Sequence, residues 1–311
     1  MSYRGNDFDV SSRFNTTDPK VVNAEVDRIY LELYPSAPTK LLDNAFRDLT
    51  RLYRGEYPGY HQCDTAYHDM QHVLDVTLAM ARLIDGYERT RVGTESFGDS
   101  LFRLGVITAL FHDMGYVREL NDHAHKNGAE YTLTHVSRGS VFLKDYLPRI
   151  GMAEMADIAA ELIHFTGYEM PVSKIKVPSL TYKLLGSMLG SADIIAQMSD
   201  RCYLEKCRDR LYPEFVAGGL TTKRTPEGTE QVVFASGEDL VIKTPAFFEG
   251  AAKRLNDDLG GCHNYAENHF GGQNLYLDEV GKNVNFAHEI GSDATDSTLK
   301  RRPPETLTPF A

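Results

Sequence analysis

The sequence lacks any apolar run approaching the ~18 residues that a membrane-spanning helix needs, so we expect no membrane protein. The opening stretch, MSYRGNDFDVSSRF, has no apolar segment of the kind that directs secretion. The sequence has only four cysteines, Cys63, Cys202, Cys207 and Cys262, and no two of them form a C-x-x-C pair. They indicate reduced thiols in a cytoplasmic protein. A basic block is also missing, and the net charge of −11 disfavours non-specific binding to DNA or RNA.

The chain is long enough to build its own hydrophobic core. Its 311 residues allow one large domain or two small ones, at roughly 100–200 residues per domain. Hydrophobic residues make up 42% and charged residues 25%, which is ordinary for a soluble globular protein and excludes disorder as the main state. A core of this size needs no disulfide to hold it together.

Helical patterns fill the first two thirds of the sequence. Residues 1–18 are polar, and we expect a loose arm there. A helix then begins at Asp18-Pro19, with Asp as the cap and Pro in the first turn. Val22, Val26, Ile29 and Leu33 form its apolar stripe. Further helices are expected near residues 39–53, 65–85, 100–115, 130–147, 152–165 and 179–212.

The pattern changes beyond Tyr212. The segment EQVVFASGEDLVIKT predicts a β-hairpin that turns at Ser-Gly-Glu-Asp, and PAFFEGAAKRL predicts a short helix. We therefore expect a helical domain over residues 19–215, a C-terminal elaboration packed on it over residues 216–290, and a flexible tail over residues 291–311. The predicted fold class is all-α, a helical bundle with a small C-terminal β-hairpin and loop elaboration.

Histidine and aspartate recur in apolar helical segments, where a buried charge needs a partner. Five expected helices carry such groups: His72, His112-Asp113, His135, His164 and Asp193. Each one alone is compatible with a core histidine bonded to a backbone carbonyl, or with an aspartate that caps a turn. Their recurrence on five helices favours a shared metal site. His68 precedes His72 by four residues, so the two project from one helix face.

Two motifs resemble those of metal-dependent hydrolases. One resembles the Y-H-N-x-x-H-x-x-D-V signature of cyclic-nucleotide phosphodiesterases and here reads Tyr67-His68-Asp69-x-x-His72-x-x-Asp75-Val76. The other resembles the A-x-x-H-D-x-G core of the HD-domain metal-dependent phosphohydrolase superfamily and here reads Ala109-x-x-His112-Asp113-x-Gly115. Over about residues 60–205, the order of the candidate residues is similar to the H…HD…H…H…D pattern of the dinuclear branch. The resemblance implies an HD-type helical domain.

The resemblance also implies two divalent transition-metal ions. Four imidazoles and two carboxylates suit Fe, Mn, Co, Ni or Zn. Asp113 would bridge the two ions, and His72, His112 and Asp193 would complete the shell of one of them. His135 and His164 would complete the shell of the other. By this analogy a metal-bridging hydroxide attacks phosphorus, and the positive charge offsets the negative charge that develops.

The same analogy assigns roles outside the metal shell. His68 matches the residue that protonates the leaving oxygen, and Asp69 or Asp75 would orient an imidazole. Arg138 and Gln197 share helical faces with His135 and Asp193 and are predicted to contact the substrate, although a solvated or packing role is equally compatible. The expected function is hydrolysis of a small phosphate ester, with a phosphodiester or a cyclic or other nucleotide as the leading class.

Several departures from these families keep alternatives open. Tyr116 stands where animal cyclic-nucleotide phosphodiesterases have a second histidine, and where the cyclic-dinucleotide branch has a lysine. The G-Y-P signature of that branch is also missing, which disfavours a cyclic di-GMP hydrolase. A di-iron oxygenase on the same fold and a nucleotide-binding regulatory module without turnover are the alternatives. The pattern assigns no role to His263, His269 or His288 and sets neither the substrate, the native metal nor the oligomeric state.

Overall fold

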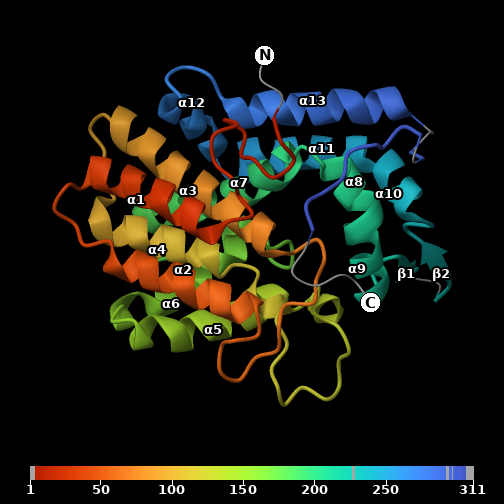
Figure 1. The fold of residues 1–311 in the computed structure, drawn as a ribbon, viewed down its shortest axis with the longest axis horizontal. Coiled ribbons are helices and arrows are strands. Elements are labelled where there is room, and N and C mark those ends of the chain that lie inside the picture. The colour runs from red at the N-terminus through yellow and green to blue at the C-terminus, as the bar shows by residue number, and fades with distance from the viewer. Residues whose placement is uncertain (1–3, 226–227, 292–293, 296, 306–311) are drawn as a thin grey trace.

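The computed structural model describes residues 4–225, 228–291, 294–295 and 297–305, and almost all of its regular structure is helical (Figure 1). The α-helices are α1 (Pro19–Leu33), α2 (Lys40–Tyr53), α3 (Met70–Thr90), α4 (Gly98–Leu110), α5 (His135–Arg149), α6 (Ala156–Leu162), α7 (Leu180–Ser199), α8 (Tyr203–Lys206), α9 (Tyr212–Ala217), α10 (Gly237–Ile242), α11 (Thr244–Lys253), α12 (Tyr265–His269) and α13 (Leu275–Ile290). Two short strands, β1 (Thr222–Arg224) and β2 (Glu230–Val232), form an antiparallel hairpin. The all-α prediction with a small β elaboration is confirmed.

Single 3₁₀ or π turns connect or extend several of these helices. They are η1 (Met114–Tyr116), η2 (Gly128–Tyr131), η3 (Ala153–Met155), η4 (Ile163–Phe165), η5 (Val172–Lys174), η6 (Cys207–Leu211), η7 (Arg254–Asp258) and η8 (Cys262–Asn264). In the described chain, no helix combines the length and apolarity needed to cross a membrane. All four cysteines are buried thiols.

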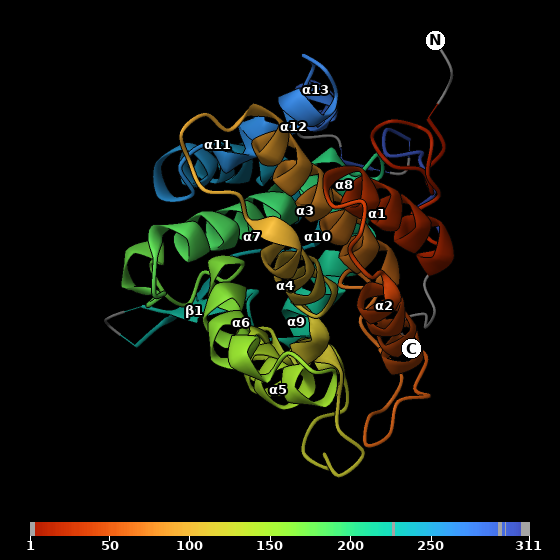
Figure 2. The ribbon, with the colours of Figure 1, turned by 90° about the vertical axis from the view of Figure 1, so that its left-hand side faces the viewer.

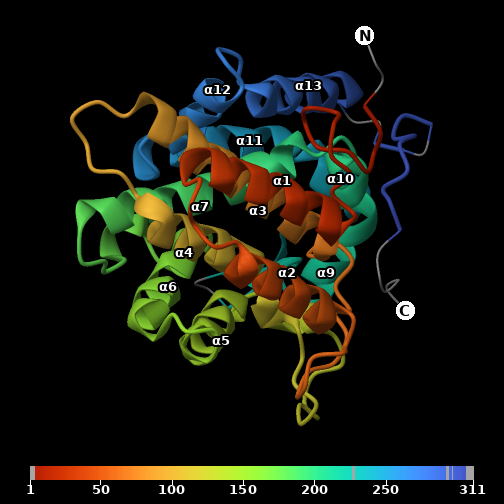
Figure 3. The same cartoon turned by 60° about the vertical axis from the view of Figure 1, so that its left-hand side comes forward.

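Helices α3 and α7 form the centre of the bundle (Figure 2). α3 packs against α1, α4, α7 and α12, and α7 also contacts α13. In Figures 1 and 3, α12 and α13 lie at one end of the molecule, and α5 and α6 lie at the other. These contacts bury most of α3, including the polar residues His72, Arg82 and Asp85.

The start and end of α3 differ from the prediction of residues 65–85. The helix begins after Asp69, whose carboxylate accepts a hydrogen bond from the backbone N–H of His72 at 2.9 Å. It continues through Gly86 to Thr90, so the predicted end at residue 85 is wrong. A Cβ atom on Gly86 would lie 1.8 Å from the carbonyl oxygen of Tyr265. This glycine therefore permits the close approach of α12 and does not end the helix.

The predicted long helix over residues 179–212 is interrupted at Asp200. α7 ends at Ser199, because the side chain of Asp200 accepts from the backbone N–H of Cys202 at 2.7 Å and caps a new turn. The ammonium of Lys206, also buried, lies 2.5 Å from the same carboxylate. Apolar periodicity continues on both sides of this break, so it predicts one helix. It gives no sign of the buried ion pair between Asp200 and Lys206 at the point where the chain bends.

The β-hairpin lies earlier in the chain than predicted. Thr222 pairs with Val232, and the connection spans residues 225–229. The predicted turn around Ser236 instead starts helix α10, because the Ser236 hydroxyl accepts from the N–H of Asp239. Acidic residues in the first turn of α10 favour a helix start, since they complement the helix dipole.

Described residues near both ends of the chain are buried against the helical body. Asp9, in the arm expected to be loose, forms a buried ion pair with Arg82 of α3 at 2.5 Å. In the predicted flexible tail, Leu299 is 3% exposed. Helix α13 was not predicted, and its buried Asn283 donates to the carbonyl of Asp200 at 2.7 Å. The last six residues of that tail, 306–311, lie outside the described residues.

One prediction about stability arises from the contact between α1 and α2. Burial and the nearby Asp43 raise the pKa of Asp27 from 3.8 to about 7. The folded state therefore keeps a proton that the unfolded state loses, and stability falls as pH rises from 3.8 through about 7. We expect Asp27→Asn to raise the free energy of unfolding by about 1–2 kcal/mol at pH 8, a figure reduced for solvent screening. At pH 4 the gain should vanish.

Urea titrations of both proteins at the two pH values measure this difference. Asp145→Asn on the exposed face of α5 is the matched control and should change little at either pH. An equal gain for Asp27→Asn at both pH values would contradict the carboxyl–carboxylate contact as its cause.

Candidate metal centre

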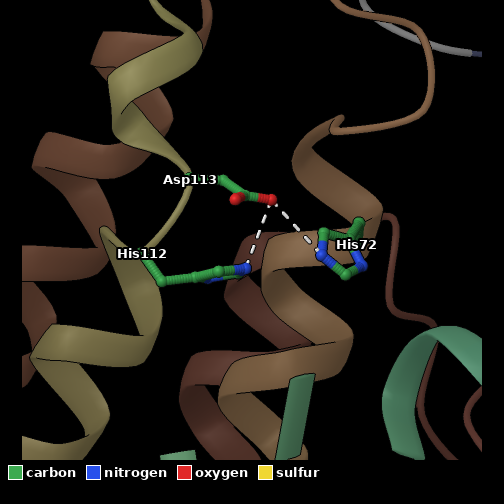
Figure 4. Close-up of side chains that lie close together, drawn as sticks. All are labelled: His72, His112 and Asp113. Carbon is green, nitrogen blue, oxygen red and sulfur yellow. Dashed lines mark ion pairs between the residues drawn. The ribbon is translucent and has the colours of Figure 1, made fainter. Parts of the chain in front are cut away.

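The His-Asp pair lies directly after a helix and not within one. Helix α4 ends at Leu110, His112 follows in the turn, and Asp113 precedes the 3₁₀ turn η1. The prediction that this pair lies inside a helix is therefore wrong. The turn aims both side chains toward the first turn of α3, where His72 lies (Figure 4). The cap by Asp69 fixes the backbone of His72 there.

Three side chains form the core of the cluster. The Oδ2 atom of Asp113 lies 3.3 Å from Nε2 of His72 and 3.2 Å from Nε2 of His112 (Figure 4). All three residues are buried, and their donor atoms lie within 4.8 Å of one another. This group could hold a metal ion, and the sequence predicted each of its members.

Two further predicted ligands border this core. Asp193 of α7 places Oδ1 3.3 Å from Nε2 of His72 and 3.8 Å from Nε2 of His112. His135, the first residue of α5, places Nε2 3.8 Å from Oδ1 of Asp113. The two carboxylate oxygens of Asp113 therefore face different imidazoles. This is the arrangement that a bridging carboxylate requires.

Backbone hydrogen bonds orient two of these imidazoles. Nδ1 of His112 lies 2.8 Å from the carbonyl of Ala109, and Nδ1 of His135 lies 2.7 Å from that of Thr132. A carbonyl only accepts, so both Nδ1 atoms carry the hydrogen. Nε2 of each neutral ring then carries an available lone pair, and a histidine coordinates a metal through this lone pair.

The electrostatics of the cluster also favour a cation. Burial alone would lower the pKa of His72, but Asp113 and Asp193 raise it to about 10. Burial alone would raise the pKa of Asp113, but His112 and the neighbouring imidazoles hold it well below its usual value. Nε2 of His112 and Oδ2 of Asp113 are buried without a well-formed hydrogen bond to any described residue. Such atoms need a partner, and a divalent cation would take the place of the imidazole protons.

His164 is placed differently from the other predicted ligands. Its Nδ1 lies 2.8 Å from Oε1 of Glu169, and it forms no ion pair with Asp113 or Asp193. Glu169 borders the cavity described below, and the nearby His164 imidazole helps to lower its pKa against the opposing effect of burial. The role of His164 as a ligand remains a prediction, and Glu169 is a carboxylate that sequence reasoning missed.

His68 lies beside the cluster and is held by a residue far away in the sequence. Its Nδ1 is 2.5 Å from Oε2 of Glu214, whose other oxygen accepts from the backbone N–H of Tyr67 at 2.6 Å. Burial would lower the pKa of His68, but Glu214 and Asp113 together raise it. Tyr116 stacks between the rings of His68 and His135, with centroids 4.2 and 4.3 Å away. Its position explains why an aromatic residue follows the His-Asp turn.

A cavity of about 620 Å³ opens onto the cluster. His68, His72, Asp113, His135 and Asp193 all border it. The C-terminal elaboration, to which the sequence pattern assigned no role, supplies part of its wall: Leu220, Phe234, Leu240 and Phe247. The cavity therefore joins the candidate metal centre to a mostly apolar chamber.

The two predicted substrate contacts have different placements. Gln197 borders the cavity, and its Oε1 accepts from the hydroxyl of Tyr67 at 3.3 Å. Arg138 does not border it, because its guanidinium donates to the carbonyls of Gly115 at 2.8 Å and Val117 at 3.0 Å. Arg138 thus supports the turn after the His-Asp pair, and its contact with the substrate remains a prediction.

Gly115 allows this turn to approach α5. A Cβ atom there would lie 1.8 Å from the carbonyl oxygen of His135. We therefore expect Gly115→Ala to displace the start of α5, to lower the free energy of unfolding by about 1–3 kcal/mol, and to weaken metal retention. Urea unfolding and elemental analysis after gel filtration measure the two effects.

Gly281→Ala on α13 is the matched control, because no atom lies within 4 Å of the added methyl group. It should stabilise the protein by about 0.5–1 kcal/mol, as alanine favours a helix over glycine. A Gly115→Ala protein with unchanged stability and metal content would contradict the close contact.

No protein-family model, curated protein or solved structure matches this chain. Function must therefore be argued from the residues of the site.

Proposed function

We propose that this protein is a metal-dependent phosphohydrolase of the HD-domain type that cleaves phosphodiesters. The observation that carries the proposal is the buried group of His72, His112 and Asp113, of which His72 and Asp113 border a cavity. His112 Nε2 and Asp113 Oδ2 are buried and approach each other at 3.2 Å without a well-formed hydrogen bond, which fits a shared cation better than it fits packing.

The donor set suggests where two divalent ions would bind. His72, His112, Asp113 and Asp193 would hold one, and Asp113 with His135 would hold the other, joined by His164. Nitrogen and carboxylate donors suit Fe, Mn, Co, Ni or Zn. Ions bound there would activate water and neutralise charge on the phosphoryl group.

The remaining residues of the site fit a proton-transfer role. Glu214 holds Nδ1 of His68, which leaves Nε2 of that ring for the cavity. The raised pKa of His68 favours the protonated ring, which can give a proton to a departing alkoxide. Such a donor serves a hydrolase more than it serves an oxygenase or a module that only binds nucleotides. The buried thiols are consistent with a reducing compartment, and we propose the cytoplasm.

The test is hydrolysis of bis(p-nitrophenyl) phosphate by Mn²⁺- or Co²⁺-loaded protein, in water labelled with heavy oxygen and without O₂. We expect turnover, with one labelled oxygen in the phosphate product. His72→Ala should abolish it, while His288→Ala, on the exposed face of α13, should not. Activity that requires iron and O₂ would support the oxygenase instead. Nucleotide binding without any turnover would support a regulatory module.

A further inference from the structure

The wall of the cavity above the metal cluster is built from apolar side chains of separate elements. Phe215 of α9 and Phe234 pack with ring centroids 5.7 Å apart, and both border the cavity. Leu220 and Leu240 border the same chamber. Leu220, Phe234 and Leu240 belong to the C-terminal elaboration, so that segment shapes part of the cavity in addition to covering the bundle.

The cavity offers little to a highly charged ligand. Among the described residues that line it, Lys243 is the one lysine or arginine. Its ammonium lies 2.7 Å from Oδ2 of Asp239 and 2.7 Å from the carbonyl of Val233, so its charge is already paired. Glu169 adds a carboxylate to the lining. Beyond the ions in the cluster, a polyphosphate would therefore meet, in the described lining, only cations that already have a carboxylate partner, namely Lys243 and the His68 ring that Glu214 holds.

Hydroxyl groups of the lining are also engaged. Thr132, Thr166 and Thr244 donate to the carbonyls of Ala129, Ile163 and Val241, at 2.6, 2.8 and 2.7 Å. Each bond stays within its own turn. These three hydroxyls are therefore not free to donate to a polar group of a ligand, such as a sugar or a base.

The mouth of the cavity is apolar too. Leu133 is 69% exposed, Tyr168 is 62% exposed, and Phe247 is 37% exposed, and all three line the cavity. Large apolar side chains that surround an opening mark a surface that a ligand covers. The rim and the wall of the cavity are apolar, and its described lining has no unpaired lysine or arginine. These features favour a ligand that is largely apolar and carries little charge.

We propose that the substrate is a phosphodiester with a single negative charge and a large apolar alcohol, aromatic or hydrocarbon, that fills this chamber. The inference rests on the proposed phosphodiesterase function. The ions would neutralise the one charge, and the chamber would bind the alcohol by excluding water from it. Polyphosphates and polar nucleosides would be poor ligands.

The first experiment varies one ester group while p-nitrophenolate remains the leaving group. We expect kcat/KM to rise at least about tenfold from the methyl to the phenyl ester and again to the naphthyl ester, because each ring buries apolar surface. The p-nitrophenyl ester of thymidine monophosphate should react no faster than the methyl ester. Equal kcat/KM values for the methyl, phenyl and naphthyl esters would overturn the inference. A higher kcat/KM for the thymidine ester than for the naphthyl ester would do the same.

The second experiment measures binding without turnover, so that it survives failure of the proposed activity. Diphenylphosphinate and dimethylphosphinate are inert monoanions, and calorimetry with Mn²⁺-loaded protein gives their affinities. We expect the diphenyl compound to bind at least about tenfold more tightly. Tighter binding with no esterase activity would refute the proposed function and retain the apolar ligand. Equal affinities would refute the apolar ligand whatever the activity.

Two rim variants locate the effect. Phe247→Ser and Leu133→Ser change exposed residues, so both should fold, and each should reduce the ratio of naphthyl to methyl kcat/KM by at least about threefold. Leu180→Ser, at an 83% exposed position that does not line the cavity, should leave the ratio unchanged. An equal fall in all three ratios would place the alcohol elsewhere.

Discussion

Asp113→Ala is expected to strip the protein of most of its metal and to lower phosphodiester turnover by at least about 10³-fold, or about 4 kcal/mol of barrier. Asp113 is the residue whose two oxygens face different histidines, Oδ2 toward His72 and His112 and Oδ1 toward His135. Its loss therefore weakens both proposed ion positions together. Elemental analysis after gel filtration and the rate on bis(p-nitrophenyl) phosphate measure the two effects.

His135→Ala provides the comparison within the cluster. It lies on one side of Asp113, so its replacement should release mainly one of two ions. Asp113→Asn keeps the shape of the side chain and guards against a folding defect as the cause of metal loss. Asp145→Ala, an exposed aspartate of α5, is the matched control and should retain both ions. Full occupancy in the Asp113→Ala protein would eliminate the bridging role.

The members of the cluster could be predicted from the sequence, but their local geometry could not. Spacing and apolar surroundings identified His72, His112, Asp113 and Asp193 as partners. The apolar pattern around the His-Asp pair, however, continued the helix through it, whereas α4 ends at Leu110. The turn depends on the close approach of α5, which is a tertiary contact that periodicity does not encode.

Residues that position the site were harder to find. Glu214 lies 146 positions from His68, just beyond the predicted helix over residues 179–212. Its role depends on the break at Asp200 and the π turn η6, which turn the chain back over the cluster. Helical spacing from His135 identified the face of α5 on which Arg138 lies. It did not predict the hydrogen bonds that the Arg138 guanidinium donates to backbone carbonyls.

The C-terminal third shows the limit of local propensity. A Ser-Gly-Glu-Asp sequence can turn a hairpin or start a helix, and the Ser236 side chain decides for the helix by capping α10. The hairpin itself pairs exposed residues, so no apolar alternation marked its register. The packing of this region against the cavity gives it a function that composition alone did not reveal.

His68→Ala is expected to retain metal and fold but to lose about 10²–10⁴-fold in kcat on diesters with a poor leaving group. Those substrates need a proton on the departing oxygen, and His68 is the imidazole that borders the cavity outside the proposed metal shell. p-Nitrophenolate departs without a proton, so the loss should shrink to a few-fold on nitrophenyl esters. Comparable losses on both substrate types would make His68 a positioning residue.

Glu214→Gln tests how the protein keeps this proton donor charged. The carboxylate raises the pKa of His68 against the opposing effect of burial, so the ring stays protonated to higher pH. Activity on poor leaving groups should therefore fall as pH rises through that pKa. In Glu214→Gln the fall should begin at lower pH, while Glu249→Gln, exposed on α11, should leave the profile unchanged. An unshifted profile with a uniformly lower rate would mean that Glu214 only orients the ring, since the lost charge would then have no effect on its proton.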